Sequence, residues 1–408
     1  MHIFWRPETG SCARPLPSLS PPASGLRSTG RCNKTTTVLP TSPEPRRVVH
    51  GTAMLAEDLA AYRKLVGDDN EVYARLQLEL EALLCGPTAD AAVTRRLERT
   101  WRTREFVAYY ERPLLLQAAL RFDALSNPGA HPLMRALRSE DPDPRFVTRL
   151  AVRSALDPDR LVPWLALATR KVQTNEVSRS VAWLWPTSLI PARPIVLVDV
   201  GCSAGLNLVA DGLELSWTGE DGETLELRPP RVLERIGFDR SPIDITRDDE
   251  ATWLQACIWP GEHARLRRLE QAIRVFREHA PPPRIERVSA QHIVPRLRRI
   301  EAAADADATV VVYQTLVRDY IDATERAHFE AELGAWLEGL APGRAIVLEL
   351  ELPNDDRSPP AELTARPSGS RPISLARCGY HPSRLEVNEA GARAFREQAR
   401  AAARSKTS

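Results

Sequence analysis

Long apolar runs are missing from this chain of 408 residues. The longest apolar stretch, Leu161–Ala168, has about half of the roughly 18 residues that a membrane-spanning helix needs, and Pro163 interrupts it. The sequence therefore predicts a protein that has no membrane as a partner.

An excess of charge of either sign is missing as well. The 55 Lys and Arg residues balance 54 Asp and Glu residues, which leaves a formal net charge of +1. Nucleic-acid-binding proteins usually present a broad basic face. We therefore expect no nucleic-acid partner.

Cysteine is scarce and scattered along the chain. The spacing includes no C-x-x-C pair and no close histidine, so neither a disulfide framework nor a metal site is expected. This usage is typical of a reducing compartment and favours a cytoplasmic protein. The six cysteines are Cys12, Cys32, Cys85, Cys202, Cys257 and Cys378.

The length suggests about two domains with tails. Residues 1–53 are rich in Pro, Ser and Arg, and we expect a disordered tail because such a segment buries little apolar surface. Another interpretation is that the translated protein starts near Met54. Amphipathic patterns predict a helical domain over residues 54–190, a Rossmann-like domain over 191–395 and a second disordered tail over 396–408.

The period of the apolar pattern changes after residue 190. Short buried strands alternate with helices, which predicts an α/β fold with a mostly parallel, Rossmann-like sheet covered by helices on both faces. An inserted hairpin is expected over 213–227 and an edge pair over 373–387. The expected parallel strands are Ile195–Val200, Arg235–Asp239, Ile285–Val288, Val310–Tyr313 and Ala345–Leu350.

A turn of small residues directly follows the first of these strands. Gly201 lets the backbone approach a ligand closely, and Gly205 lets the next helix pack against the strand. Asp199 lies at the carboxyl end of the strand, where open parallel sheets bind ligands. The residues expected to hold a cofactor here are Asp199, Gly201, Cys202, Ser203, Ala204, Gly205 and Asn207.

Three interpretations of this turn compete. A dinucleotide fingerprint is improbable because Ser203 and Leu206 replace two of its glycines. The segment also satisfies the G-x-S-x-G pattern of serine hydrolases, with Ser203 as the nucleophile and His381 late enough in the chain to serve as its base. The third interpretation is a site for S-adenosylmethionine.

The turn resembles motif I of Rossmann-like methyltransferases, with Ser203 in place of the middle glycine. In such enzymes an acidic residue at the end of the second strand holds the ribose hydroxyls, which makes Asp239 the corresponding carboxylate. The spacing from Asp199 to Asp239 is about double the ~20 residues of a strand–helix–strand unit, and the inserted hairpin would account for the excess. Alternatively, Asp239 caps a turn before Pro242.

A polar cluster precedes the glycine turn. If the helix that begins near Leu161 continues, its apolar stripe through Leu165 and Val172 leads into polar and charged side chains. Burying these groups without partners would cost several kcal/mol. They either clamp the helical region to the sheet or form a wall of the substrate pocket. The cluster comprises Gln173, Asn175, Glu176 and Arg179.

The same segment carries a resemblance to a known family. Residues 170–179, followed about twenty residues later by the strand and the G-C-S-A-G-L-N-L turn, resemble domain-of-unknown-function family 2332, an uncharacterised bacterial family. The similarity spans about residues 100–390. It implies a fold like that of S-adenosylmethionine-dependent methyltransferases, but no established activity. The chain departs from the family pattern at Gln314, where a His is usual.

No residue can be assigned a catalytic role from the sequence, but three are candidates: Glu176, Gln314 and Glu351. Glu349 and Glu351 share one side of the fifth strand, so that one of them could act as a general base or cap the following loop. His381 is expected at the surface. The basic helix over 265–277 is expected to be a solvated face.

The leading hypothesis is an S-adenosylmethionine-dependent methyltransferase of a small-molecule substrate. Because the sulfonium already activates the methyl group, such an enzyme mainly supplies alignment and an optional base. The second hypothesis is a non-catalytic ligand-binding or scaffolding module on the same fold. The third is a serine hydrolase that uses Ser203.

Overall fold

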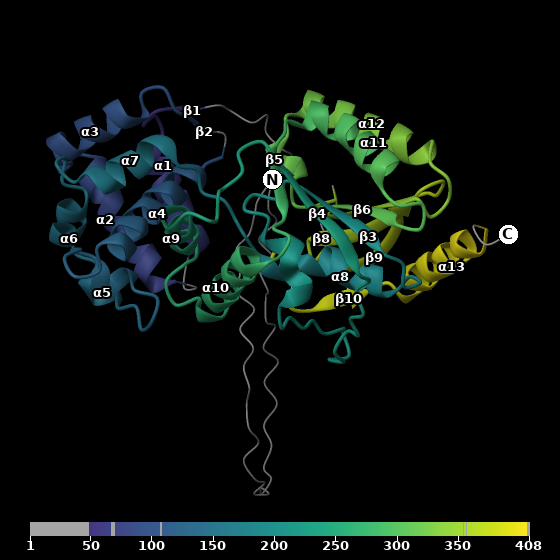
Figure 1. The fold of residues 1–408 in the computed structure, drawn as a ribbon. Coiled ribbons are helices and arrows are strands. Elements are labelled where there is room, and N and C mark those ends of the chain that lie inside the picture. Colours follow the sequence, from purple (N-terminus) through teal and green to yellow (C-terminus); the bar gives the residue numbers. More distant parts are fainter. Residues whose placement is uncertain (1–48, 67–69, 107, 354, 356, 406–408) are drawn as a thin grey trace, which may run out of the picture.

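The computed structural model describes residues 49–66, 70–106, 108–353, 355 and 357–405. Most of the predicted N-terminal tail, residues 1–48, lies outside the described residues. The described chain forms a helical domain beside a domain built on one sheet (Figure 1).

The helical domain begins with a two-stranded antiparallel pair and continues as short packed helices. Asn70 and Asp90 begin two of these helices, because their side chains accept hydrogen bonds from the first free N–H groups. The elements are β1 (Val49–His50), α1 (Leu55–Val66), α2 (Glu71–Leu84), α3 (Ala91–Trp101), β2 (Glu105–Phe106), α4 (Glu111–Ser126), α5 (Met134–Leu137), the 3₁₀ helix η2 (Pro144–Phe146), α6 (Arg149–Ala155) and α7 (Leu161–Thr169).

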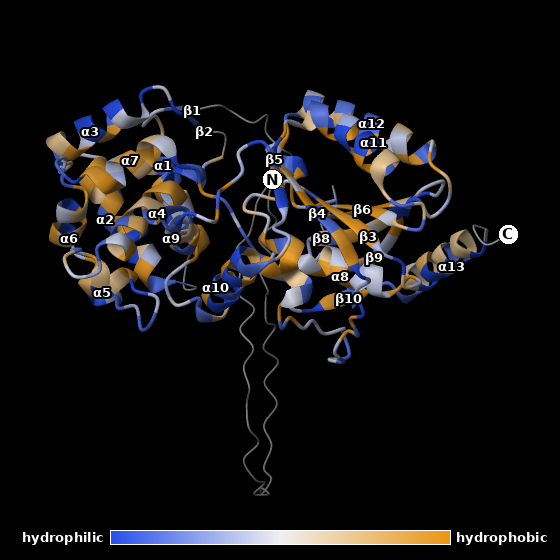
Figure 2. Ribbon diagram, in the orientation of Figure 1, coloured by the Kyte–Doolittle hydropathy of each residue, from blue (hydrophilic) through white to orange (hydrophobic). Residues whose placement is uncertain are grey.

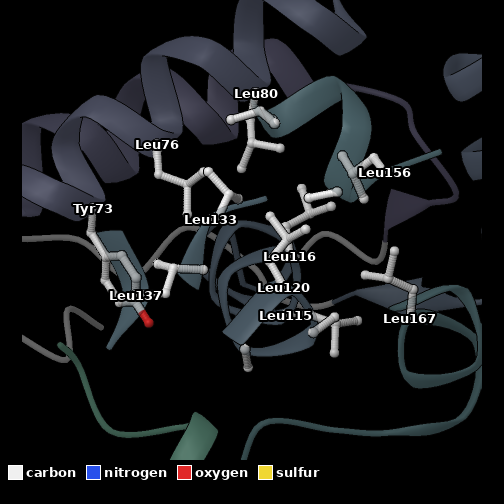
Figure 3. Close-up of a cluster of buried hydrophobic side chains, with 14 of the residues drawn as sticks. Tyr73, Leu76, Leu80, Leu115, Leu116, Leu120, Leu133, Leu137, Leu156 and Leu167 are labelled. Atoms are coloured by element: carbon white, nitrogen blue, oxygen red, sulfur yellow. The ribbon is translucent and has the colours of Figure 1, made fainter. Parts of the chain in front are cut away.

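Apolar side chains from these helices form one continuous core. Figure 3 shows part of it, where Leu76 and Leu80 of α2 lie over Leu116 and Leu120 of α4. Burial of these apolar side chains away from water supplies the main stabilisation of the helical domain.

Helix α9 (Asp248–Ala256) completes the helical domain although it follows the second strand of the sheet. Trp253 of α9 is buried in the same core, with its ring 5.6 Å from that of Phe122. Conversely, η3 (Val177–Ser180) and α8 (Val181–Ser188), which fall inside the predicted helical domain, pack with the sheet. Each domain therefore includes a segment from the other side of residue 190, and the single predicted boundary at that residue does not separate the two domains.

The sheet has eight strands in the order β10-β9-β8-β7-β6-β3-β4-β5. The five strands from β7 to β5 are parallel, and β8, β9 and β10 extend the sheet as antiparallel neighbours. The strands are β3 (Ile195–Val200), β4 (Val232–Asp239), β5 (Arg284–Arg287), β6 (Thr309–Thr315), β7 (Ala345–Glu351), β8 (Ala361–Pro367), β9 (Ile373–Cys378) and β10 (Leu385–Val387). The predicted α/β class, parallel strands and edge pair are confirmed.

Helices cover both faces of the sheet, and the central strands are apolar on both sides (Figure 2). Val196 and Val198 face the layer of α11 (Ile293–Ala303) and α12 (Ala323–Glu338). Ile195 and Leu197 face α8, and Phe395 of α13 (Glu389–Ser405) belongs to that same core. Helix α10 (His263–Glu278) lies between the sheet and the helical domain (Figure 1).

One sequence prediction about the sheet domain is confirmed in part and another is wrong. The hairpin expected over 213–227 is present at its turn, where Thr218 and Thr224 form an antiparallel bridge and the N–H of Leu225 donates to the carbonyl oxygen of Trp217, but its arms form no regular strands. The tail expected to be disordered over 396–408 is helical up to Ser405, because Phe395 and Ala392 bury one side of α13 against the sheet. None of the helices in the described part of the chain has the length and apolar character needed to cross a lipid bilayer.

Candidate ligand site

The glycine turn lies at the point where the strand order reverses. From β3 the chain moves to β4 and β5 on one side, and it then returns to β6 and β7 on the other side of β3. Ligands of open parallel sheets bind outside the carboxyl ends of the strands at such a switch point. The structure therefore places the turn where the sequence predicts a ligand.

The turn itself is tightly enclosed. Gly201 and Gly205 have φ angles of +77° and +74°, and a Cβ on either would lie 2.5 Å from the side chain of Val317 or Ile285, respectively. The expected α-helix after the turn is a seven-residue 3₁₀ helix, η4 (Leu206–Gly212). The side chain of Val317 thus faces Gly201, and a short 3₁₀ helix takes the place of the expected helix.

The polar segment before η3 has no regular secondary structure and passes over the turn. The predicted helical stripe is wrong, because α7 ends at Thr169 and its Leu161 and Leu165 side chains are 74% and 65% exposed. Asn175 Nδ2 donates to Ser203 Oγ at 3.1 Å, and the Ser203 hydroxyl donates to Gln173 Oε1. The segment 170–176 therefore closes the turn with its own side chains.

Asp239 holds the turn from the side of β4. Its two carboxylate oxygens accept hydrogen bonds from the backbone N–H of Ser203 at 2.8 Å and of Ser241 at 2.7 Å. Asp239 therefore caps the turn that precedes Pro242, which is the alternative role considered in the sequence analysis.

Asp199 lies buried beneath the turn. One of its oxygens accepts a hydrogen bond from the Tyr313 hydroxyl of β6 at 2.8 Å. Burial raises the pKa of Asp199 to about 8, so this carboxyl is mostly protonated at neutral pH. Burial also raises the pKa of Cys202 well above its usual value, which leaves that thiol a poor nucleophile.

Glu176 is the centre of a buried cluster of charges. Arg265 and Arg268 of α10 lie 2.7 and 3.5 Å from its carboxylate, and His381 Nδ1 lies 2.9 Å from it. These partners hold the pKa of Glu176 well below its usual range despite its burial. Burial lowers the pKa of His381 to about 4.

Two predictions fail at this cluster. The His381 side chain is only 15% exposed, whereas a surface position was expected. The basic face of α10 is not wholly solvated, because Arg265 reaches inward and its side chain is only 10% exposed. The imidazole of His381 and the guanidinium of Arg265 both contact the carboxylate of Glu176, although they come from distant parts of the chain. The periodicity of a single helix cannot predict such contacts.

A small cavity of about 30 Å³ remains between the turn and the segment that closes it. It brings most of the predicted cofactor residues together with three of the four predicted pocket residues. Thr315, at the end of β6, also lines it and was not predicted, although it directly follows Gln314, which pairs with the last residue of β3. The lining residues are Thr174, Asn175, Glu176, Arg179, Asp199, Gly201, Cys202, Ser203, Leu206, Asn207 and Thr315.

Of the three catalytic candidates, only Glu176 lines this cavity. Glu351 accepts hydrogen bonds from the N–H groups of Val317 and Arg318 at 2.9 and 3.4 Å, so it holds the loop after β6. Burial raises the pKa of Glu351 to about 8. Gln314 donates to Glu349 at 2.9 Å.

The geometry does not support a serine hydrolase. The partners of Ser203 Oγ are the amides of Gln173 and Asn175, and an amide cannot act as a general base. His381, the expected base, lies against Glu176. No group of three or more His, Cys, Asp and Glu side chains in the described ranges is arranged to hold a metal ion.

Comparison with known proteins identifies the family. A family model described as "Uncharacterized protein conserved in bacteria (DUF2332)" matches residues 69–387. The chain belongs to this family. The DUF2332 match runs from just before α2 to the end of β10, so it includes most of the helical domain as well as the sheet. Neither the curated proteins nor the solved structures include a match.

Proposed function

We propose that this DUF2332 protein binds a small molecule at the carboxyl ends of β3 and β6, and that it is an S-adenosylmethionine-dependent methyltransferase. The observation that supports the proposal is the position of the glycine turn. It lies at the switch point of a doubly wound sheet, with Asp199 and Asp239 at the ends of two adjacent strands.

The described conformation does not accommodate this cofactor. A cavity of about 30 Å³ is large enough for one or two water molecules, whereas nucleoside-sized ligands occupy sites of about 300 Å³ or more. Gln173 and Asn175 fill one side of the turn, and Val317 fills the other. The proposal therefore requires that residues 173–175 leave the turn when the ligand enters.

Residues 173–175 can leave the turn while Arg170 and Glu176, which are held by ion pairs, stay in place. Gln173 and Asn175 hold the turn through hydrogen bonds to Ser203 and to the N–H of Ala204, and each is worth about 0.5–1.5 kcal/mol net. A ligand that replaces these contacts recovers this cost. Opening frees the Ser203 hydroxyl and the Ala204 N–H, while Asp239 keeps lone pairs that can accept ribose hydroxyls.

Calorimetric titration with S-adenosylmethionine and its demethylated product tests the proposal. We expect both to bind the wild type, and Asp239→Ala to bind at least tenfold more weakly. Asn175→Ala should bind more tightly than the wild type, because its side chain occupies the ligand's place. No binding at millimolar ligand by either the wild type or Asn175→Ala would reject the methyltransferase.

One observation favours a second function, a non-catalytic binding or scaffolding module. The polar groups of the turn are satisfied by the chain itself, through Asn175, Gln173 and Asp239. A turn that needs no ligand to complete its hydrogen bonds can serve as a purely structural joint. Folded Asn175→Ala protein that binds neither nucleoside would support this module.

A further inference from the structure

Arg179 is a buried cation beside the cavity at the glycine turn. The residue is 8% exposed and lines the cavity. Its Nε donates to the carbonyl oxygen of Tyr380 at 3.0 Å. Among the described residues, no carboxylate oxygen lies within ion-pair distance of its guanidinium. A buried charge without a counter-ion is costly, so its retention calls for a partner from outside the chain.

The acidic neighbours of Arg179 do not supply that partner. Glu176 is already matched by Arg265 and Arg268, with which it forms ion pairs. Asp199 is bound to the hydroxyl of Tyr313, and its raised pKa leaves it mostly neutral at pH 7. The cavity consequently carries the positive charge of Arg179.

A second polar group in the same cavity lacks a partner. Asn207 lines the cavity, and its Oδ1 atom is buried with no hydrogen-bond partner among the described residues. Rotation of the amide exchanges Oδ1 and Nδ2, which places an N–H donor at that position. Arg179 and Asn207 can then donate together to one group.

We propose that Arg179 receives an anionic group of the ligand, a carboxylate or a phosphate, in the cavity at the glycine turn. A guanidinium forms paired hydrogen bonds to such oxyanions. The inference rests on the proposed ligand site, but not on the identity of the ligand. A cavity of about 30 Å³ has room for one or two oxygen atoms of the anionic group, and the rest of the ligand enters where residues 173–175 leave the turn.

Small anions provide the direct test. Sodium acetate and sodium phosphate are titrated against the wild type by thermal unfolding, with chloride at equal ionic strength as the reference. We expect the midpoint temperature to rise and saturate with at least one anion. Arg179→Gln should abolish the rise, and Arg179→Lys should weaken the binding because the ammonium lacks the planar fork. Arg160→Gln, which removes a partner of Asp123 in the helical domain, should retain it.

The reference unfolding in chloride separates binding from a structural role. Because Arg179 has no ion pair to lose, Arg179→Gln should unfold at or above the wild-type temperature. No saturable rise with either anion, or an equal rise in Arg179→Gln, would overturn the proposal. If Arg179→Gln does not fold, a wild-type-like anion response of Arg179→Lys would overturn it in the same way.

The source of the anionic group is found with two nucleosides. S-Adenosylhomocysteine carries a carboxylate, and methylthioadenosine lacks it. If the cofactor supplies the anion, Arg179→Gln should weaken binding of the first at least tenfold and leave the second unchanged. If neither nucleoside binds but the anion response depends on Arg179, the methyltransferase is rejected and the anion site stands.

Discussion

The side chain of Asn175 binds both the hydroxyl of Ser203 and the backbone of the next residue. Its Nδ2 donates to Ser203 Oγ at 3.1 Å, and its Oδ1 accepts from the N–H of Ala204 at 3.4 Å. A segment that leads into the sheet domain thus closes the turn at the sheet's switch point. The stability of the turn should depend in part on this amide, beside the contacts of Gln173 and Asp239.

Asn175→Ala should lower the free energy of unfolding by roughly 1–2 kcal/mol, because it removes hydrogen bonds to groups that are partly shielded from water. Hydrogen exchange at Ser203 and Ala204 should become faster. The matched control is Asn388→Ala, which removes the side-chain acceptor for the N–H of Gly391 in α13. This control should lower the stability by a similar amount without changing exchange at the turn; equal exchange at the turn in both variants would contradict the prediction.

The stability of Asp199→Asn should exceed that of the wild type by an amount that depends on pH. Burial raises the pKa of Asp199 from 3.8 to about 8 in the folded protein. Between about pH 4 and 8 the folded state binds the proton more tightly than the unfolded state, so this group lowers the stability as the pH rises. Asparagine removes that slope and can still accept the hydrogen bond from Tyr313.

Urea unfolding of both proteins from pH 4 to 9 measures the effect. The difference should be small near pH 4, grow to the order of 5 kcal/mol near pH 8 and then level off. Curves that stay parallel over this range would show that Asp199 is ionised in the folded protein.

Gly201→Ala should be strongly destabilising for two separable reasons. The residue has a φ of +77°, and its new Cβ would lie 2.5 Å from Cγ2 of Val317. We expect a cost of roughly 2–4 kcal/mol. Gly222→Ala is the control for backbone strain alone, since Gly222 has a φ of +85° and no atom within 4 Å of its Cβ position.

Part of the cost of Gly201→Ala should disappear in the background of Val317→Ala, because that variant removes the clashing methyl groups. Chemical denaturation of the four proteins of this double-mutant cycle gives the coupling energy. Additive effects would mean that the side chain of Val317 does not clash with the new Cβ at position 201.

Glu176→Gln should lower the free energy of unfolding by roughly 3–5 kcal/mol, because it removes the buried carboxylate that pairs with Arg268 and that Arg265 shares with Glu262. The control is Glu226→Gln, which breaks an exposed ion pair with Arg228 and should cost less than about 1 kcal/mol. Similar losses for the two variants, measured by urea unfolding, would contradict a central role for Glu176.

The stability of the wild type and that of Glu176→Gln should also respond differently to acid. The pKa of Glu176 is held well below 4.5 in the folded protein, so its contribution is present above that pH and is lost as the pH falls further. The stability difference between the wild type and Glu176→Gln should therefore shrink below about pH 4.5.

The parallel strands could be predicted because each is short, apolar and locally distinct. Ile195–Val200 is buried along its whole length, as a central parallel strand requires. Strand β8 (Ala361–Pro367) was missed because it alternates buried and half-buried residues next to a proline-rich loop. Helix α9 could not be assigned to the helical domain, since only the packing of Trp253 on Phe122 decides that placement.

The sequence by itself determined the α/β class, the central strands and the position of the glycine turn. These features depend on residue pattern and on backbone conformations that glycine favours, both of which are local. Only the tertiary structure decided that Asn175 closes the turn, that Val317 faces Gly201 and that His381 lies against Glu176. These contacts join residues from about 30 to 200 positions apart. Steric fit and charge burial between such distant residues produce no periodic pattern of residue types, so the sequence does not predict them.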